Sequence, residues 1–117
     1  EDIAVFAYLL ISTPVVTTAH VLARIYKHPD SLRHNRQDEE DCALGMVEAV
    51  FSSLPDECQS LRRRYTAQRY LSLFRSAQNA EDRPAAKRFL YQALLLSPLQ
   101  AMRWSYLRKG LRLMAGV

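Results

Sequence analysis

Residues 38–54, "DEEDCALGMVEAVFSSL", decide the fold class of this chain. Four acidic residues open the stretch, and acids in a first turn interact favourably with the positive end of a helix dipole. Apolar side chains then recur at intervals of one, three and four residues: Ala43, Met46, Val47, Val50, Phe51 and Leu54. This spacing places them on one face of a helix. We therefore predict an amphipathic helix here, with a core packed against that face.

Helical patterns continue from this stretch to the end of the chain. "SLPDE" at residues 53–57 ends one helix and begins the next, with Pro55 and Asp56 in the first turn of the new helix. We expect that helix to reach about residue 79, where "NAEDRP" interrupts it. Two more helices are predicted over about 84–96 and 99–115, separated by Ser97-Pro98. The expected fold class is mainly α, a helical bundle or set of helical hairpins.

The N-terminal part of the chain has a different character. Residues 1–12 are predicted to form a helix, with Glu1 and Asp2 in its first turn. The following "VVTTAHVLARIY" is rich in β-branched residues, so we expect a small β element near residues 15–27, made of one or two short strands. Residues 27–37 are polar and contain Pro29, which predicts a loop.

Composition limits the class of protein. Hydrophobic residues make up 49% of the 117 residues, which argues against disorder and suits a single domain or a fragment of one. The apolar run from Ile3 to Ile11 is shorter than the roughly 20 residues of a membrane span. Acidic residues precede that run, whereas a signal peptide carries a basic segment there. We expect a cytoplasmic location.

Few residues suit catalysis or metal binding. Cys42 and Cys58 are the only cysteines, and we expect both to be buried, reduced thiols. The three histidines lack the spacing of metal ligands, so no metal site is predicted. The chain contains no glycine-rich phosphate loop and no nucleophile motif.

Residues 67–100 contain a pattern typical of closely packed helix pairs. Ala86 and Ala93 are seven residues apart with Leu90 between them, and Pro98 follows. Small residues at such positions let two helices approach closely, as in tetratricopeptide-type repeats. No second copy follows, so the pattern predicts either one repeat-like hairpin or an ordinary pair of antiparallel helices.

The last helix is expected to be basic and amphipathic. Arg108, Lys109 and Arg112 cluster on one side, and apolar residues cover much of the other. Such a helix either contacts an anionic membrane surface or an acidic partner, or docks its apolar face on neighbouring helices. The net charge of +4 and the run Arg62–Arg64 fit no nucleic-acid-binding motif, and we expect no nucleic acid partner.

"ED" at residues 1–2, "TPVVTTAHVLARIYKHPDSLRHN" at residues 13–35 and a helical tail together resemble the C-terminal part of a bacterial family 2 glycosyltransferase. In that family an acidic pair opens a helix beneath the acceptor site, and a short strand pair leads to a Tyr-Arg-x-His segment. Here Tyr26 stands where the family has arginine, two residues before His28. The resemblance implies that residues 1–35 are the remnant of a GT-A catalytic domain and residues 38–117 its helical tail.

The resemblance also implies roles for individual residues. Asp2 would be the general base that deprotonates the acceptor hydroxyl, flanked by Glu1, and His28 would lie near the substrates. Arg24 and Lys27 are the cations beside it. Nucleotide-sugar and acceptor would bind through an N-terminal domain that holds Mg²⁺ or Mn²⁺. This chain alone would carry no cofactor and no activity.

A second hypothesis comes from a different class of function. In it the chain is a non-enzymatic helical module that binds a protein or an acidic partner through residues 67–100 and the last helix. In either case the basic last helix is the element that would contact the inner face of a membrane.

Overall fold

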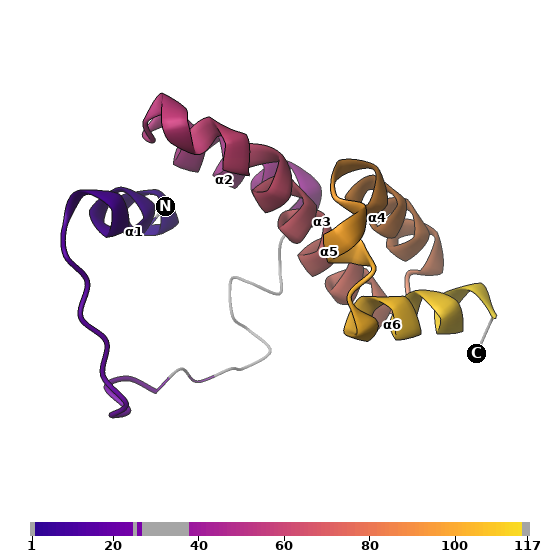
Figure 1. The fold of residues 1–117 in the computed structure, drawn as a ribbon. Coiled ribbons are helices and arrows are strands. Elements are labelled where there is room, and N and C mark those ends of the chain that lie inside the picture. The colour runs from indigo at the N-terminus through magenta and orange to yellow at the C-terminus, as the bar shows by residue number, and fades with distance from the viewer. Residues whose placement is uncertain (1, 25, 27–37, 116–117) are drawn as a thin grey trace.

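The computed structural model describes residues 2–24, 26 and 38–115 and is mainly helical (Figure 1). Its elements, in chain order, are α1 (Asp2–Ser12), α2 (Glu39–Ser52), the 3-10 helix η1 (Asp56–Leu61), α3 (Arg62–Asn79), α4 (Arg83–Leu96), α5 (Pro98–Ala101) and α6 (Trp104–Met114). The predicted fold class, mainly α with helical hairpins, is confirmed.

The centre of the molecule is an antiparallel hairpin of α3 and α4. Phe74 and Leu71 of α3 are its most deeply buried large side chains. Ala86 and Ala93 of α4 are completely buried, and Leu90 lies in the same core. Because their side chains are small, these alanines allow the two helices to approach closely, as their spacing predicted.

A tight turn joins the two helices of the hairpin. Asp82 N–H donates to Ala77 O at 2.9 Å and Glu81 N–H donates to Gln78 O at 3.2 Å, the pattern of a Schellman C-cap. Glu81 has a φ of 58°, in the left-handed region. The Asp82 carboxylate then accepts from Ala85 N–H at 3.1 Å and caps the N-terminus of α4. Two caps in succession therefore fix where the hairpin reverses.

The helix predicted from residues 38–54 is α2, and it packs along α3 with its apolar face. Ala43 joins the central core, whereas Val47, Val50 and Phe51 form a second cluster with Tyr65. The rings of Phe51 and Tyr65 are 5.8 Å apart between centroids. One face of α2 thus carries two separate groups of core residues.

The segment between α2 and α3 differs in detail from the expectation. Asp56 does not begin an α-helix directly, because residues Asp56–Leu61 form the 3-10 helix η1 and α3 begins at Arg62. Gln59 Nε2 donates to Phe51 O at 2.8 Å. This bond holds η1 against the end of α2 and satisfies one of the carbonyls that a helix end leaves free.

The single helix predicted over residues 99–115 is wrong in one respect, because the structure divides it into α5 and α6. Arg103 has ψ 138°, an extended conformation that interrupts the helix. After this break α6 turns back and packs on α4. Gly110 is at the contact, where a Cβ would lie 2.9 Å from Leu90 Cδ2.

The expected β element is absent from the described part of residues 15–27, that is, residues 15–24 and 26. This stretch has no regular structure and extends away from the helices, as the indigo trace in Figure 1 shows. A strand gains its stability from a hydrogen-bonded neighbour, and an isolated pair of strands is only marginally stable in water.

The radius of gyration is 16.2 Å, above the roughly 13 Å of a compact chain of this length, so the molecule is extended.

Candidate functional site

The residues predicted to form a catalytic site lie at the edge of what the structure describes. Glu1, Lys27 and His28 are outside the described residues. Asp2 begins α1, although its side chain is not among those described. Arg24 is exposed in the irregular stretch after α1. The proposed grouping of these side chains therefore stays a prediction.

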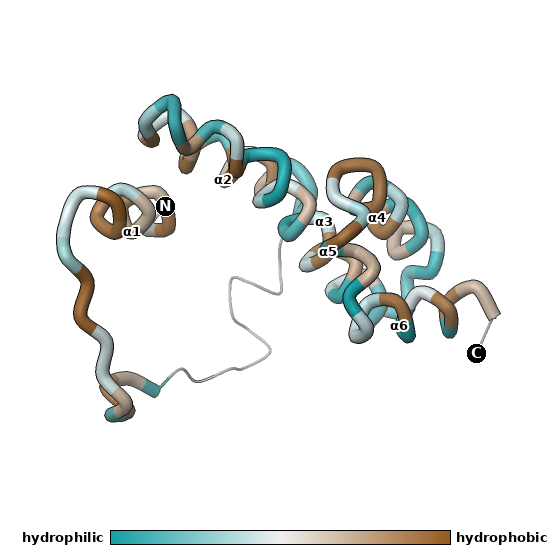
Figure 2. The backbone as a smooth tube through the Cα atoms, in the orientation of Figure 1, coloured by the Kyte–Doolittle hydropathy of each residue, from teal (hydrophilic) through white to brown (hydrophobic). Residues whose placement is uncertain are grey.

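The helix that Asp2 begins has an unusual surface. Its large apolar side chains have exposed fractions between 40% and 62%: Ile3, Val5, Phe6, Tyr8, Leu9, Leu10 and Ile11. The partly buried Ala4 and Ala7 pack against the cluster of Val47, Val50 and Phe51 in α2. Figure 2 shows α1 mostly in the hydrophobic half of the colour scale. A helix that is apolar all round is normally buried in a larger core.

A shallow depression lies where α1 meets α2. Ile3 and Ala4 line one side, and Cys42, Met46 and Val50 are among the residues of the other. Its lining is mainly apolar, and it continues the exposed surface of α1. Cys42 is a free, exposed thiol and Cys58 is a free, half-buried thiol. The prediction that both cysteines are buried is wrong.

A second depression is acidic and lies between the start of α2 and the hairpin. Arg88 Nη2 donates to Glu40 Oε2 at 2.7 Å, and Tyr70 Oη donates to Glu40 Oε1 at 3.3 Å. Ser76 Oγ donates to Glu39 Oε1 at 3.2 Å. These bonds join α2 to both helices of the hairpin. Burial, and then the neighbouring charge of Glu40, raise the pKa of Tyr70 above its ordinary value of 10.0.

The acidic depression is better explained by packing than by chemistry. Its carboxylates Glu39 and Glu40 already accept bonds from α3 and α4 side chains. Within residues 2–24, 26 and 38–115 no group of His, Cys, Asp and Glu side chains has the arrangement of a metal site. We assign the depression a role in holding α2 on the hairpin.

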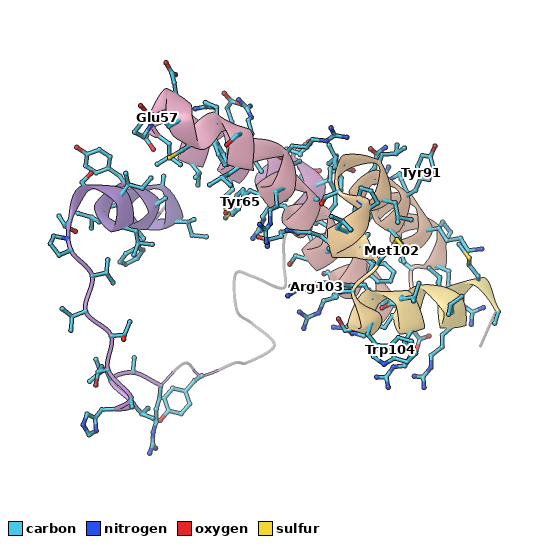
Figure 3. The ribbon with its side chains drawn as sticks, in the orientation of Figure 1. Glu57, Tyr65, Tyr91, Met102, Arg103 and Trp104 are labelled. Atoms are coloured by element: carbon cyan, nitrogen blue, oxygen red, sulfur yellow. The ribbon has the colours of Figure 1, made fainter. Side chains whose placement is uncertain are left out.

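The basic last helix combines a docked face and an exposed face. Tyr106 and Leu113 pack against the core, and Gln78 Nε2 donates to Lys109 O at 3.3 Å. On the outer side Trp104 is 74% exposed and Met114 is 73% exposed. Figure 3 shows Trp104 on the side of α6 that faces away from α4. The sequence left docking and surface contact open, and the structure contains both faces.

None of the described helices has the length and apolar character needed to cross a membrane. Among the described helices, α1 and the outer side of α6 each expose several large apolar side chains. Sequence periodicity marked both helices as apolar but did not reveal which residues stay uncovered, since that depends on the neighbours of each helix.

Comparisons of the chain with family models, curated proteins and solved structures find no match.

Proposed function

We propose that this chain is the C-terminal region of a sugar-nucleotide-dependent glycosyltransferase of the GT-A type, and that α1 packs against the remainder of its catalytic domain. The glycosyltransferase assignment rests on the resemblance of residues 1–35, and the observation that supports the packing is the apolar surface of α1, whose large side chains are at least 40% exposed. In water this surface is unfavourable, at about 25 cal/mol per Å² of apolar area. A catalytic domain packed on α1 would remove it from water.

The same docking gives the acidic end of α1 a chemical role. Asp2 is the first residue of the helix, so a domain that covers α1 would meet this residue at its edge. Inverting glycosyl transfer requires a base that accepts the proton of the acceptor hydroxyl while its oxygen attacks the anomeric carbon and the nucleoside diphosphate leaves. We assign that role to Asp2, with Glu1, His28, Arg24 and Lys27 lining the substrates.

The other partners follow from the proposed reaction. Mg²⁺ or Mn²⁺ held by carboxylates of the catalytic domain would neutralise the charge of the leaving diphosphate. The helices from α2 to α6 would support α1 through the contact of Ala4 and Ala7 with α2. The substrates are a nucleotide sugar and an acceptor with a free hydroxyl group.

The test is to change Asp2 to Asn in a protein that contains this chain together with its catalytic domain. Release of nucleoside diphosphate from a panel of nucleotide sugars would be measured with Mg²⁺ or Mn²⁺ present. Loss of a general base lowers kcat by roughly 100- to 10,000-fold. The matched control is Asp41→Asn, an exposed acid of α2 for which full activity is expected. Normal activity of Asp2→Asn would contradict the assignment of the base.

A non-catalytic helical module is the second candidate function. It is favoured by the α3–α4 hairpin, in which the fully buried Ala67, Ala86 and Ala93 match the small positions of repeat-type helix pairs. In this case a protein or an acidic partner binds to residues 67–100 and the last helix, and the chain has no catalytic role. The Asp2→Asn experiment separates the candidates, because binding through residues 67–100 and the last helix would survive the change and no nucleotide-sugar turnover would accompany it.

A further inference from the structure

We propose that the outer face of α6 docks on an anionic membrane surface. This outer face consists of Trp104, Leu107, Leu111 and Met114. The proposal is independent of glycosyl transfer, since it concerns the opposite end of the molecule from α1 (Figure 1).

The apolar side of α6 is wider than the surface on which it packs. Tyr106 and Leu113 contact the core, and Gly110 is buried against Leu90. The four residues of the outer face follow one another at intervals of three, four and three, so they form one stripe along the helix. All four are exposed, with Trp104 and Met114 above 70%. Among the described residues, the apolar side of α6 is therefore only partly covered, and the exposed fractions of the stripe range from 37% at Leu107 to 74% at Trp104.

Two more exposed apolar side chains lie in the chain before α6. Leu99 is 87% exposed and Met102 is 58% exposed, and Figure 3 shows Met102, Arg103 and Trp104 where α5 passes into α6. Ordinary surface helices expose single apolar residues, whereas a contiguous group marks a site of interaction. The segment from Leu99 to Met114 thus has more apolar surface than packing on α4 requires.

Charge identifies the kind of partner. Arg108 and Arg112 each follow a residue of the outer face, so both lie beside the stripe. From Arg83 to the end of the chain there are seven arginine and lysine residues and no acid. Asp82 directly precedes this region, and Glu81 lines a depression together with the cations Arg83 and Arg112. Four of these cations, Arg103, Arg108, Lys109 and Arg112, lie on α6 or directly before it, so the helix carries a positive charge that complements an anionic surface.

The shape of the exposed face favours a lipid surface over a protein groove. A groove that binds an amphipathic helix encloses much of its circumference, but α6 is already packed on α4 along its inner side. A bilayer interface needs only one face of a helix lying in its plane. Apolar residues with a tryptophan on one face and cations beside them are typical of helices that bind in this way.

The chain contains its own reporter for this interaction, because Trp104 is the only tryptophan. The full chain would be titrated with vesicles of phosphatidylcholine and with vesicles containing 30% phosphatidylglycerol. With the anionic vesicles we expect a blue shift of the emission and quenching by brominated lipids, both reduced as the salt concentration rises. Quenching by brominated lipid places α6 itself, rather than α1, in the interface.

Variants with matched controls test the two components separately. Arg108→Gln with Arg112→Gln should weaken partitioning about 30-fold, at roughly fivefold for each cation near the surface. The control, Arg64→Gln with Arg75→Gln, removes the same charge from exposed positions of α3 and should change partitioning little. Leu111→Ser should weaken partitioning about tenfold. Its control is Leu61→Ser in η1, where the leucine is almost equally exposed.

Several results would overturn the proposal. Unchanged emission with anionic vesicles at low salt would exclude a lipid surface and favour an acidic protein as the partner. An equal, salt-independent shift with neutral vesicles would refute the charge argument. Co-sedimentation without quenching of Trp104 would assign binding to α1 instead. A blue shift that depends on protein concentration and needs no vesicles would identify a second copy of the chain as the occupant.

Discussion

At the residue scale, Glu81 has a backbone conformation that is unfavourable for a residue with a side chain. It occupies the C′ position of the Schellman turn after α3 with a φ of 58°. This position usually belongs to glycine, because a side chain in the left-handed region costs roughly 1–2 kcal/mol. The turn forms nevertheless because the buried helices on either side determine its conformation.

Replacing Glu81 by Gly should raise the free energy of unfolding by about 0.5–1 kcal/mol, because the relief of the backbone cost exceeds the added entropy of the unfolded chain. Thermal unfolding would show this as a higher Tm. Glu81→Ala is the control, since it removes the same carboxylate but keeps a Cβ in the left-handed region. Equal stability of the two variants would mean that backbone strain is not the cause.

The raised pKa of Tyr70 predicts how the free energy of unfolding depends on pH. Its pKa is raised in the folded protein by burial and by Glu40, so folding favours the protonated phenol. This contribution is fully present below pH 10.0, the ordinary pKa, and is lost as the pH rises above it and the unfolded form ionises first. Tyr70→Phe should therefore reduce the decline of stability between pH 10 and 11 in urea unfolding. The exposed Tyr91 supplies the control, Tyr91→Phe, which should retain the full decline.

At the scale of elements, two helical glycines differ in their surroundings. Gly45 in α2 has nothing within 4 Å of the position of a Cβ, whereas at Gly110 in α6 that position is 2.9 Å from Leu90 Cδ2. Leu90 is itself a buried core residue. Gly45 therefore lowers the helix propensity of α2 without any gain in packing, whereas Gly110 leaves the space that lets α6 approach α4 closely.

Alanine at each glycine should separate these roles. Gly45→Ala should stabilise the protein by about 1 kcal/mol, the difference in helix propensity. Gly110→Ala gains the same propensity but must displace Leu90, and overpacking costs roughly 1–3 kcal/mol, so we expect no net gain or a loss. Chemical denaturation measures both values. A full gain at Gly110 would show that α6 does not pack closely on α4.

At the scale of the whole molecule, the central core does not depend on α1. All residues of the larger buried cluster come from position 43 onward, and α1 contributes only Ala4 and Ala7 to the margin of the smaller one. Charge is also divided, since residues 1–82 contain 12 acids and nine arginine and lysine residues, whereas the rest contains cations alone. The two exposed apolar surfaces thus lie in regions of different charge.

Removal of residues 1–37 should leave a cooperatively folding domain. We expect a loss of about 1–2 kcal/mol, from the contacts of Ala4 and Ala7 with α2. Binding of the apolar dye ANS should fall, because the exposed side chains of α1 are gone. Circular dichroism during heating and dye fluorescence measure the two effects. An unfolded product would show that α1 belongs to the core.

The sequence by itself determined that this protein is helical and where most of its helices lie. The periodicity of residues 38–54 and the breaks at Asp82 and Pro98 are local signals, and local spacing is enough to define a helix and its buried side. For the same reason, the close approach of α3 and α4 was visible in the spacing of Ala86 and Ala93. The candidate catalytic residues were likewise named from the sequence, and their grouping stays a prediction.

Only the tertiary structure decided which apolar surfaces are covered. β-branched residues at positions 15–24 and 26 form no strand, because a strand requires a distant partner that local sequence does not specify. The break at Arg103 and the burial of Gly110 divide the apolar side of α6 into a packed half and an exposed half. Sequence encodes the amphipathicity of each helix, whereas the exposure of Trp104 and of α1 depends on which neighbours the folded chain brings to them.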